Sequence, residues 1–557
     1  MVERLFRIIY QEISGLHEAA FILAGFVLLS QILAIVRDRL LAHIFGAGAT
    51  LDIYYAAFRI PDFIYVSLAS LVASAVLIPF IAPKLQDVER ARQFFNSVFT
   101  LFFGAILAVS VVIFFAMPAL SKFVVPGLSS SAQEELITLS RILLLSPLLL
   151  GLSGLFASIT QSLRRFFVYA VSPTLYNAGI IIGIIFFYPY FGLSGIAYGV
   201  VLGALFHALV QMPVLVKNRF IPQFTTRFNW KEIKEVLLIS LPRTITLSAH
   251  QITLLVLVAL ASLMEEGSIS IFNLSFNLQS VPLSIIGVSY SVAAFPTLAR
   301  LFSNGEREAF ANQIATAIRH IIFWSLPVLS LFIVLRAQIV RTILGTGLFD
   351  WSATRLTAAS LALFVVSVVA QGLMLLFVRG YYAAGKTLKP LLINVSSSLF
   401  IVFFSFFLLR LYSISDFFRY FIEALFRVED IPGTQILMLP LAFSLGVLIN
   451  VTALWFVFRK DFSVSSSGVG RTIQESLFGA VVSGFVAYQF LRFFDGVFDL
   501  NTFLGISAQG ALSGVFGIIA GAAALRLLQN RELEEIAESF KHKFSKEKPI
   551  APDQTSV

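Results

Sequence analysis

The sequence predicts an all-α polytopic membrane protein with fourteen transmembrane helices. Hydrophobic residues make up 58% of the 557-residue chain, charged residues only 13%, and the mean hydropathy is +0.88. These values lie outside the range of soluble globular domains. In addition, fourteen apolar runs are long enough to cross roughly 30 Å of hydrocarbon as helices. Cysteine is absent, which excludes disulfides, thiol catalysis and cysteine-ligated metals.

The elements follow in order along the chain. The opening segment MVERLFRIIYQEISGLHEA mixes charged and apolar residues, so we expect an interfacial amphipathic helix and no cleaved signal peptide. The transmembrane helices are expected at residues 18–36, 63–82, 94–117, 137–162, 167–189, 194–216, 237–263, 268–298, 314–335, 356–378, 391–410, 436–458, 475–493 and 503–527.

The distribution of basic residues predicts that both termini are cytoplasmic. With the N-terminus inside, the N-tail, the even-numbered loops and the C-tail hold 26 Lys and Arg residues, and the outward loops hold 10. This bias follows the positive-inside rule. The net charge of +9 therefore reflects topology and contact with anionic membrane lipids, and no nucleic-acid partner is expected.

An internal repeat predicts two pseudo-symmetric six-helix lobes. Residues 48–85 align with 267–301 with small gaps, and each repeat would open one half. The expected domains are therefore an N-lobe at 1–216, a cytoplasmic linker at 217–235, a C-lobe at 236–460, a C-terminal helix pair at 461–530 and a charged cytoplasmic tail at 531–557.

Two segments outside the spans have patterns of their own. IVRTILGTGLFD, residues 339–350, has an amphipathic start and two glycines, which favours a re-entrant or surface helix. DFFRYFIEALFRVED, residues 416–430, repeats apolar positions at helical spacing among charges, which predicts a helix lying on the outer surface.

Charges cluster at the end of the first span, where an apolar environment makes them costly. An Arg or Asp at the membrane centre costs roughly 2.5–3.5 kcal/mol, so such residues usually face a bundle interior or a watery cavity. Asp52 and Arg59 are seven residues apart and would share a helix face, with Pro61 breaking the helix next to them. Such arginines suit an anionic group such as phosphate. Alternatively, Arg37 and its neighbours only mark the water-exposed helix end.

Three stretches resemble the signatures of a known family. VRDRLLAHIFGAGATLDIYYAAFRIPDF at 36–63, IVRTILGTGLFD at 339–350 and VRGYYAAGKT at 378–387 are similar to segments of the MurJ (MviN) lipid II flippases, of the MOP exporter superfamily. The resemblance covers essentially the whole chain. It implies a V-shaped pair of lobes around a cavity and export of a lipid-linked peptidoglycan precursor across the bacterial cytoplasmic membrane by alternating access. It also implies a lipid-tail groove on the last two helices and resetting by the membrane potential or a monovalent ion, without another cofactor.

The family's substrate residues transfer only in part. By resemblance, Arg37, Asp52 and Arg59 match its cavity Arg, its Asp after the Gly-Ala-Gly turn and its basic residue before proline. Other family arginines are replaced, by Gln31 on the first helix and by Asn277 on the eighth.

Arg243 and His250 on the seventh span could restore positive charge from the opposite lobe. Alternatively, Arg243 only extends toward the cytoplasmic interface and His250 only packs.

Several other patterns are discounted. GYYAAGKT at 380–387 fits a phosphate loop but stands between two membrane spans, so ATP use is not expected. The glycine pairs Gly179/Gly183 and Gly517/Gly521 predict close helix packing. No paired-aspartate, histidine-rich or Ser/His/Asp set is present, so we expect a transporter and neither an enzyme nor a metal site.

The function remains open between classes. Besides lipid II, the substrate could be another lipid-linked oligosaccharide or a small molecule, as in drug exporters of the superfamily, although drug export predicts acidic cavity residues. From a different class, the chain could be a non-transporting scaffold for cell-envelope enzymes.

Overall fold

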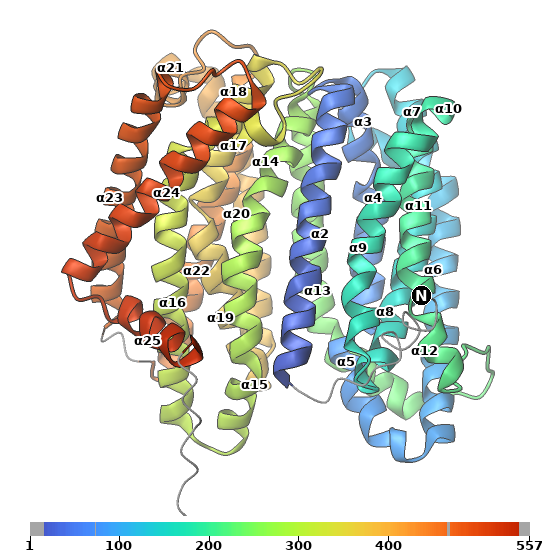
Figure 1. Ribbon diagram of the computed structural model, residues 1–557. Coiled ribbons are helices and arrows are strands. Elements are labelled where there is room, and N and C mark those ends of the chain that lie inside the picture. Colours follow the sequence, from blue (N-terminus) through green and yellow to red (C-terminus); the bar gives the residue numbers. More distant parts are fainter. Residues whose placement is uncertain (1–15, 73, 465–467, 545–557) are drawn as a thin grey trace, which may run out of the picture. The chain divides into compact units, whose positions relative to one another are not determined.

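The computed structural model describes residues 16–72, 74–464 and 468–544. The expected interfacial helix at the N-terminus lies outside these residues, as does the end of the C-tail. The described residues are helical without any strand (Figure 1), which confirms the all-α prediction. The α-helices are α2 (Leu16–Phe45), α3 (Ala49–Ala57), α4 (Arg59–Ala69), α5 (Ser74–Ile81), α6 (Val88–Val124), α7 (Ser130–Leu143), α8 (Leu145–Ser162), α9 (Phe166–Ile182), α10 (Tyr188–Phe191), α11 (Leu193–Leu209), α12 (Met212–Lys217), α13 (Trp230–Ser262), α14 (Ser268–Pro282), α15 (Ser289–Ser303), α16 (Arg307–Val334), α17 (Arg336–Ile343), α18 (Trp351–Val365), α19 (Val368–Ala383), α20 (Leu388–Ile414), α21 (Asp416–Phe426), α22 (Met438–Phe462), α23 (Val469–Asp495), α24 (Phe503–Leu527) and α25 (Arg531–Phe544).

Shorter turns complete several of these helices. Three are 3-10 helices and two are π-helical segments that bridge consecutive α-helices. They are η1 (Ser70–Val72), η2 (Ala82–Gln86), η3 (Gly183–Phe187), η4 (Leu283–Val288) and η5 (Thr434–Leu437).

Within the described residues, twelve helices are long and apolar enough to cross a membrane, or thirteen if the bent pair α18 and α19 counts as one span. Each matches one of the expected runs. The expected first span, 18–36, lies within α2, which is not among these twelve. The protein is therefore a multi-pass membrane protein, and the count of fourteen stays a prediction.

The chain forms two compact units. The first contains Met1–Val281, Ile343–Phe364 and Lys386–Asn450, and the second contains Pro282–Thr342, Val365–Gly385 and Val451–Val557. In the first unit, α9 and α11 pack closely through glycines. A Cβ on Gly183 would lie only 2.6 Å from the Cα of Gly199, and one on Gly179 would overlap Gly203. The predicted packing role of Gly179 and Gly183 is therefore confirmed.

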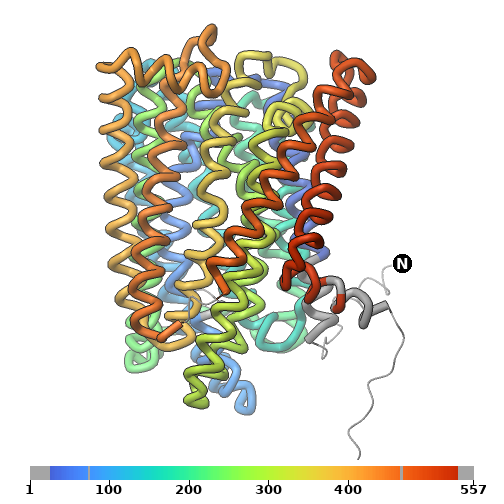
Figure 2. The backbone as a smooth tube through the Cα atoms, turned by 90° about the vertical axis from the view of Figure 1, so that its left-hand side faces the viewer, coloured from blue at the N-terminus to red at the C-terminus, as the bar shows by residue number. Residues whose placement is uncertain are grey.

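In the second unit, α23 and α24 run side by side along most of their length (Figure 2). Here too a glycine permits the approach, because a Cβ on Gly517 would lie 2.6 Å from the Ser483 carbonyl oxygen. Beside them, α16 contributes to a small apolar core with α23. This core consists of Leu331, Leu335, Ala487 and Leu491.

The charged C-tail begins as a helix, as expected, and α25 is held by a buried ion pair in the second unit. Glu532 is only 3% exposed and lies 3.2 Å from Arg319 on α16. The Thr472 hydroxyl on α23 also donates a hydrogen bond to Glu532, at 2.8 Å. Because both charges are removed from water, they depend on each other, and loss of one partner would leave an uncompensated charge.

The two segments outside the spans both contain helices, and their expected places at the membrane stay predictions. DFFRYFIEALFRVED forms α21, which leaves Phe417, Tyr420 and Leu425 exposed. The stretch IVRTILGTGLFD contains the end of the short helix α17 and then turns at Gly347, whose φ is +60°. GYYAAGKT forms the end of α19 and a turn before α20, so no strand precedes it as a phosphate loop would require.

The close contact at Gly183 predicts that an alanine there destabilises the protein, whereas an alanine at an uncrowded glycine does not. Replacing Gly183 by Ala should lower the unfolding temperature in detergent, since overpacking costs roughly 1–3 kcal/mol. The control is Gly104→Ala on α6, where a Cβ would meet nothing within 4 Å. That change should be neutral or slightly stabilising, because Ala favours helix by about 1 kcal/mol over Gly. Equal effects of the two substitutions would contradict the packing argument.

Candidate functional site

A cavity of about 300 Å³ lies among six helices of the first unit. We call it the arginine cavity, because two arginines line it together with aromatic and amide side chains. Its residues come from α2, from α3 and α4, and from α9, α13 and α14. They are Arg37, Tyr54, Tyr55, Phe58, Arg59, Asp62, Tyr176, Ile180, Gln251, Leu254, Phe272, Asn273, Phe276 and Asn277.

A helix break places Arg59 in the cavity. α3 ends at Ala57, and α4 starts at Arg59, with Phe58 between them. Pro61 then falls in the first turn of α4, where its missing N–H removes no hydrogen bond. The break that was expected at this proline therefore lies before Arg59, and Asp52 and Arg59 do not share one continuous helix.

Arg59 has incomplete hydrogen bonding. Its guanidinium donates to the Asn273 side-chain oxygen, whereas its buried Nε has no partner among the described residues. The hydroxyl of Tyr55, a residue 8% exposed, also lacks a partner in the described chain. A buried donor without an acceptor costs about 1–3 kcal/mol. The cavity therefore offers unused donors to a group with acceptor oxygens.

Arg37 is held by a polar network. Its guanidinium lies 2.8 Å from the Asp38 carboxylate and donates to the Asn177 side-chain oxygen at 3.1 Å. Asn277 donates to the other Asp38 oxygen at 3.0 Å. Asp38 therefore links Arg37 on α2 to Asn277 on α14. The end of α2 is thus not simply a water-exposed charged terminus, since Asp38 is 5% exposed.

Asp52 has a different position from the two arginines. It is 4% exposed and does not line the arginine cavity. Its carboxylate accepts hydrogen bonds from the backbone N–H of Gly267 at 2.8 Å and of Ser270 at 2.7 Å, and from the Ser270 hydroxyl at 2.5 Å. It therefore caps the N-terminus of α14, where orphan N–H groups and the helix dipole favour a negative charge.

A second carboxylate completes this arrangement. Glu266, in the turn before α14, accepts a hydrogen bond from the Ala49 N–H at 2.9 Å, and Ala49 is the first residue of α3. Asp52 from α3 thus caps α14, and Glu266 from the turn before α14 caps α3. We call these contacts the reciprocal caps. The approach needs Gly267, because a Cβ there would collide with the backbone of Ala47.

The remaining sequence-predicted site residues lie at different places. Asn277 lines the arginine cavity, whereas Gln31, Arg243 and His250 do not. His250 packs edge-on to the Phe443 ring at a centroid distance of 6.4 Å.

Sequence reasoning missed much of the cavity wall. Tyr54, Tyr55 and Asp62 stand in the quoted signature stretch but carry no pattern that separates them from ordinary packing residues. Tyr176 and Asn273 come from distant helices. Only the fold brings them together. Asp62 also changes the charge balance, because it adds a carboxylate to a cavity for which the sequence suggested an excess of arginines.

The fold of this chain is shared by solved transporters. A solved lipid II flippase MurJ in an inward closed conformation matches with a TM-score of 0.72 and 21% identity, over 92% of this chain and 100% of that one. An inward-facing MATE family multidrug resistance transporter matches with a TM-score of 0.62 and 14% identity, over 78% and 94% of the two chains.

Sequence comparison gives the family. The model of the lipid II flippase MurJ matches residues 41–509, so the chain belongs to the MurJ family. The probable lipid II flippase MurJ of Rhizobium tropici is 29% identical over 402 residues, which are 68% of this chain and 74% of that protein. The lipid II flippase MurJ of Burkholderia cenocepacia is 24% identical over 391 residues, 68% and 76% of the two chains. The resemblance seen in the signature stretches is confirmed.

The reciprocal caps predict a large effect of removing Asp52. Asp52→Ala leaves two backbone N–H groups and one hydroxyl without their acceptor, so we expect a loss of roughly 2–4 kcal/mol, at about 1–3 kcal/mol for each buried orphan group after partial relaxation. Thermal unfolding of the purified protein would measure it.

The control for that experiment is Asp87→Ala at the N-terminus of α6. Asp87 accepts one exposed bond, from the Arg90 N–H at 3.2 Å, and such a cap contributes about 1 kcal/mol. If Asp52→Ala were no more destabilising than this control, the carboxylate would not be holding α14.

Proposed function

We propose that this protein is a lipid II flippase. It moves the lipid-linked peptidoglycan precursor from the inner to the outer leaflet of the bacterial cytoplasmic membrane by alternating access, with both chain termini in the cytoplasm. The observation that carries the proposal is the arginine cavity within a MurJ-family chain, where the Arg59 Nε and the Tyr55 hydroxyl are buried without hydrogen-bond acceptors in the described structure.

The chemistry of the cavity suits a diphosphate group. A guanidinium stays charged and presents several donors in a plane, which match phosphate oxygens. The substrate oxygens would take up the unused donor of Arg59 and compete with Asp38 for Arg37. About 300 Å³ is at the lower end of ligand-site volumes. This state would therefore enclose the diphosphate region and not the entire headgroup.

The reciprocal caps would be formed in one state of the transport cycle and broken in another. While they are formed, the start of α3 is bound to the start of α14 by hydrogen bonds to carboxylate groups. An opening of this end must separate them, and it exposes both helix N-termini to water, which can replace the lost bonds. During alternating access, the N–H groups at the starts of α3 and α14 would thus exchange their hydrogen bonds to carboxylates for hydrogen bonds to water.

The energy source belongs to the same proposal. The phosphate-loop pattern forms a helix end and a turn, so we propose transport without ATP hydrolysis, reset by the membrane potential or a monovalent ion. The lipid tail would lie along α23 and α24, whose exposed apolar side chains include Phe485, Ile518 and Ile519. Cell-wall synthesis enzymes would supply and consume the substrate.

One observation favours a second candidate. Asp62 lines the cavity, and an acidic group there suits a cationic small molecule, as in multidrug exporters of this fold. No comparable observation favours another lipid-linked oligosaccharide or a non-transporting scaffold.

Complementation tests the lipid II proposal. In a strain depleted of its own lipid II flippase, Arg59→Ala and Arg37→Ala should abolish growth, and each should slow movement of lipid II in proteoliposomes by roughly tenfold or more, the equivalent of about 1.4 kcal/mol. Lys386→Ala, in the turn after α19, removes a charge outside the cavity and should leave both measurements unchanged. Normal transport by the two cavity variants would refute the proposal.

Substitution of Asp62 separates the two substrate classes. An anionic substrate is repelled by this carboxylate, so Asp62→Asn should keep or increase lipid II transport. A cationic substrate would depend on it, and transport of a lipophilic cation dye would then fall in the same variant. Loss of dye efflux in this variant, from a protein that moves no lipid II before substitution, would favour the small-molecule candidate.

A further inference from the structure

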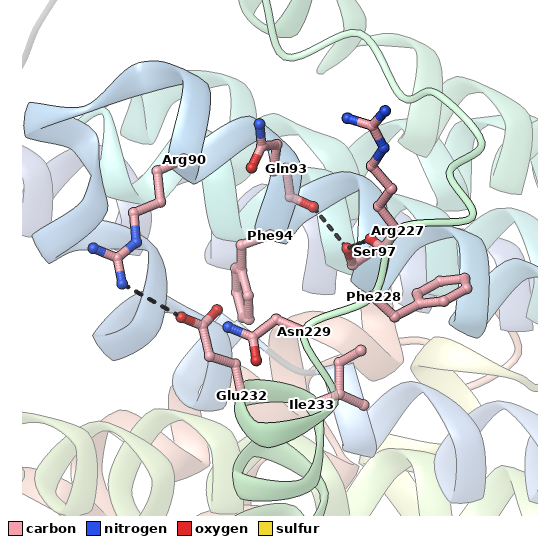
Figure 3. A pocket seen from close by; sticks show the side chains of 9 residues that line it. All are labelled: Arg90, Gln93, Phe94, Ser97, Arg227, Phe228, Asn229, Glu232 and Ile233. Carbon is pink, nitrogen blue, oxygen red and sulfur yellow. Dashed lines mark hydrogen bonds and ion pairs between the residues drawn. The ribbon is translucent and has the colours of Figure 1, made fainter.

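A second cavity lies in the first unit, at the junction of α6 with the segment that precedes α13 (Figure 3). Its volume is about 500 Å³, and we call it the linker pocket. It shares no residue with the arginine cavity. Its lining consists of Arg90, Gln93, Phe94, Ser97, Arg227, Phe228, Asn229, Glu232 and Ile233.

The linker pocket lies at a membrane boundary. Both α6 and α13 are candidate membrane spans, and both begin at this pocket. Phe224 and Trp230 beside it are 69% and 63% exposed, and the Trp230 ring lies 5.4 Å from that of Phe228. Exposed aromatic side chains at the end of a span are typical of the headgroup layer of a bilayer. Their position indicates that this pocket faces lipid headgroups.

The walls of the pocket are fixed by hydrogen bonds between α6 and the linker. The Ser97 hydroxyl donates to the Arg227 carbonyl oxygen at 3.1 Å. The Asn96 side chain accepts from the Gln223 N–H, and the Thr100 hydroxyl accepts from the Thr225 N–H, both at 3.1 Å. Asn96 and Ser97 are 7% and 4% exposed. The linker is thus attached to α6 through buried polar side chains, which holds Arg227 at the pocket.

The charges around the pocket leave a positive excess. Glu232 lies 3.6 Å from the Lys84 ammonium and 3.8 Å from the Arg90 guanidinium. The Arg227 guanidinium makes no ion pair within the described part of the chain. Figure 3 shows Arg90 and Arg227 on either side of Gln93. Lys84 and Arg90 therefore share one carboxylate, and Arg227 adds a positive charge without one.

The start of α13 adds further donors. This helix has 33 residues, and its N-cap residue Asn229 makes no side-chain capping bond. Asn229 and Glu232 line the pocket, so the uncapped first turn adjoins it. The orphan N–H groups and the positive dipole end of a long helix favour an anion, as do the two arginines.

We propose that the linker pocket binds the phosphodiester headgroup of an anionic membrane phospholipid. The phosphate would lie between Arg90 and Arg227, and the acyl chains would follow the exposed apolar side chains of α13, including Leu237, Leu238 and Leu241. The exposed aromatic pair favours a lipid over a soluble phosphate, since only a lipid brings its phosphate to the headgroup layer. The site is separate from the arginine cavity, and its occupation stabilises the linker in its attached position.

Native mass spectrometry of the full-length protein in detergent tests this site. We expect one phosphatidylglycerol to bind in preference to phosphatidylcholine. In Arg90→Gln/Arg227→Gln the affinity for phosphatidylglycerol should fall roughly ten- to thirtyfold, because each surface cation contributes about a factor of five to attraction for an anionic lipid. The matched control is Lys231→Gln/Lys234→Gln, which removes two exposed charges from the same segment without touching the pocket lining.

The outcomes are distinct. Retention of phosphatidylglycerol by the arginine variant, or equal loss in both variants, overturns the proposal, the latter showing unspecific attraction to surface charge. A third arm titrates inorganic phosphate, and tight phosphate binding without lipid preference also overturns it. Arg227→Gln alone removes an exposed side chain without breaking an ion pair, so it reports on the site if the double variant misfolds. Lipid II transport is not part of this readout, so a failure here is separate from a failure of the proposed function.

Discussion

Two carboxylates that cap each other's helices are the constraint on which the rest of the structure depends. Asp52, near the start of α3, satisfies the first turn of α14, and Glu266, in the turn before α14, satisfies the start of α3. The Asp52 cap is buried, where no water replaces a lost acceptor, whereas the Glu266 bond to Ala49 is exposed. The reciprocal caps therefore fix where both helices start. The cavity residues of α3 and α14, such as Tyr54 and Asn273, lie on the two helices that these caps hold together.

The arginine cavity follows from these positions. Once α3 and α14 start together, Arg59 meets Asn273 and Asn277 meets Asp38. Two amide side chains of α14 thus pair with charged groups: Asn273 accepts from Arg59, and Asn277 donates to Asp38. Without them, these charged groups would need charged partners. The cavity is more nearly neutral than its arginines suggest, because Asp38 and Asp62 stand beside them. Its capacity for an anion depends on unused hydrogen-bond donors as much as on net charge.

The linker pocket shows the same principle with a different outcome. There a helix begins beside basic side chains, but its N-cap residue Asn229 makes no side-chain capping bond. At α14 the protein supplies its own carboxylate, whereas at α13 the donors remain available to an external anion. A capped helix start holds two segments of the protein together, and an uncapped one beside arginines is open to a ligand. The difference is one of tertiary structure, since the carboxylate that caps α14 is Asp52 from α3, whereas Asn229 at the start of α13 makes no capping bond.

The sequence by itself determined the membrane class, the positions of the apolar runs, the surface helix α21 and the glycine contacts of α9, because these depend on composition and local periodicity. The signature stretches also determined the family. Only the tertiary structure decided that Asp52 caps a helix instead of lining the cavity, and that Tyr176 and Asn273 join the cavity wall. The reason is physical: hydrophobicity acts within one segment, whereas a buried hydrogen bond needs two segments whose meeting no local pattern records. Arg59 and Arg37 could be found from their cost in an apolar run, but their partners could not.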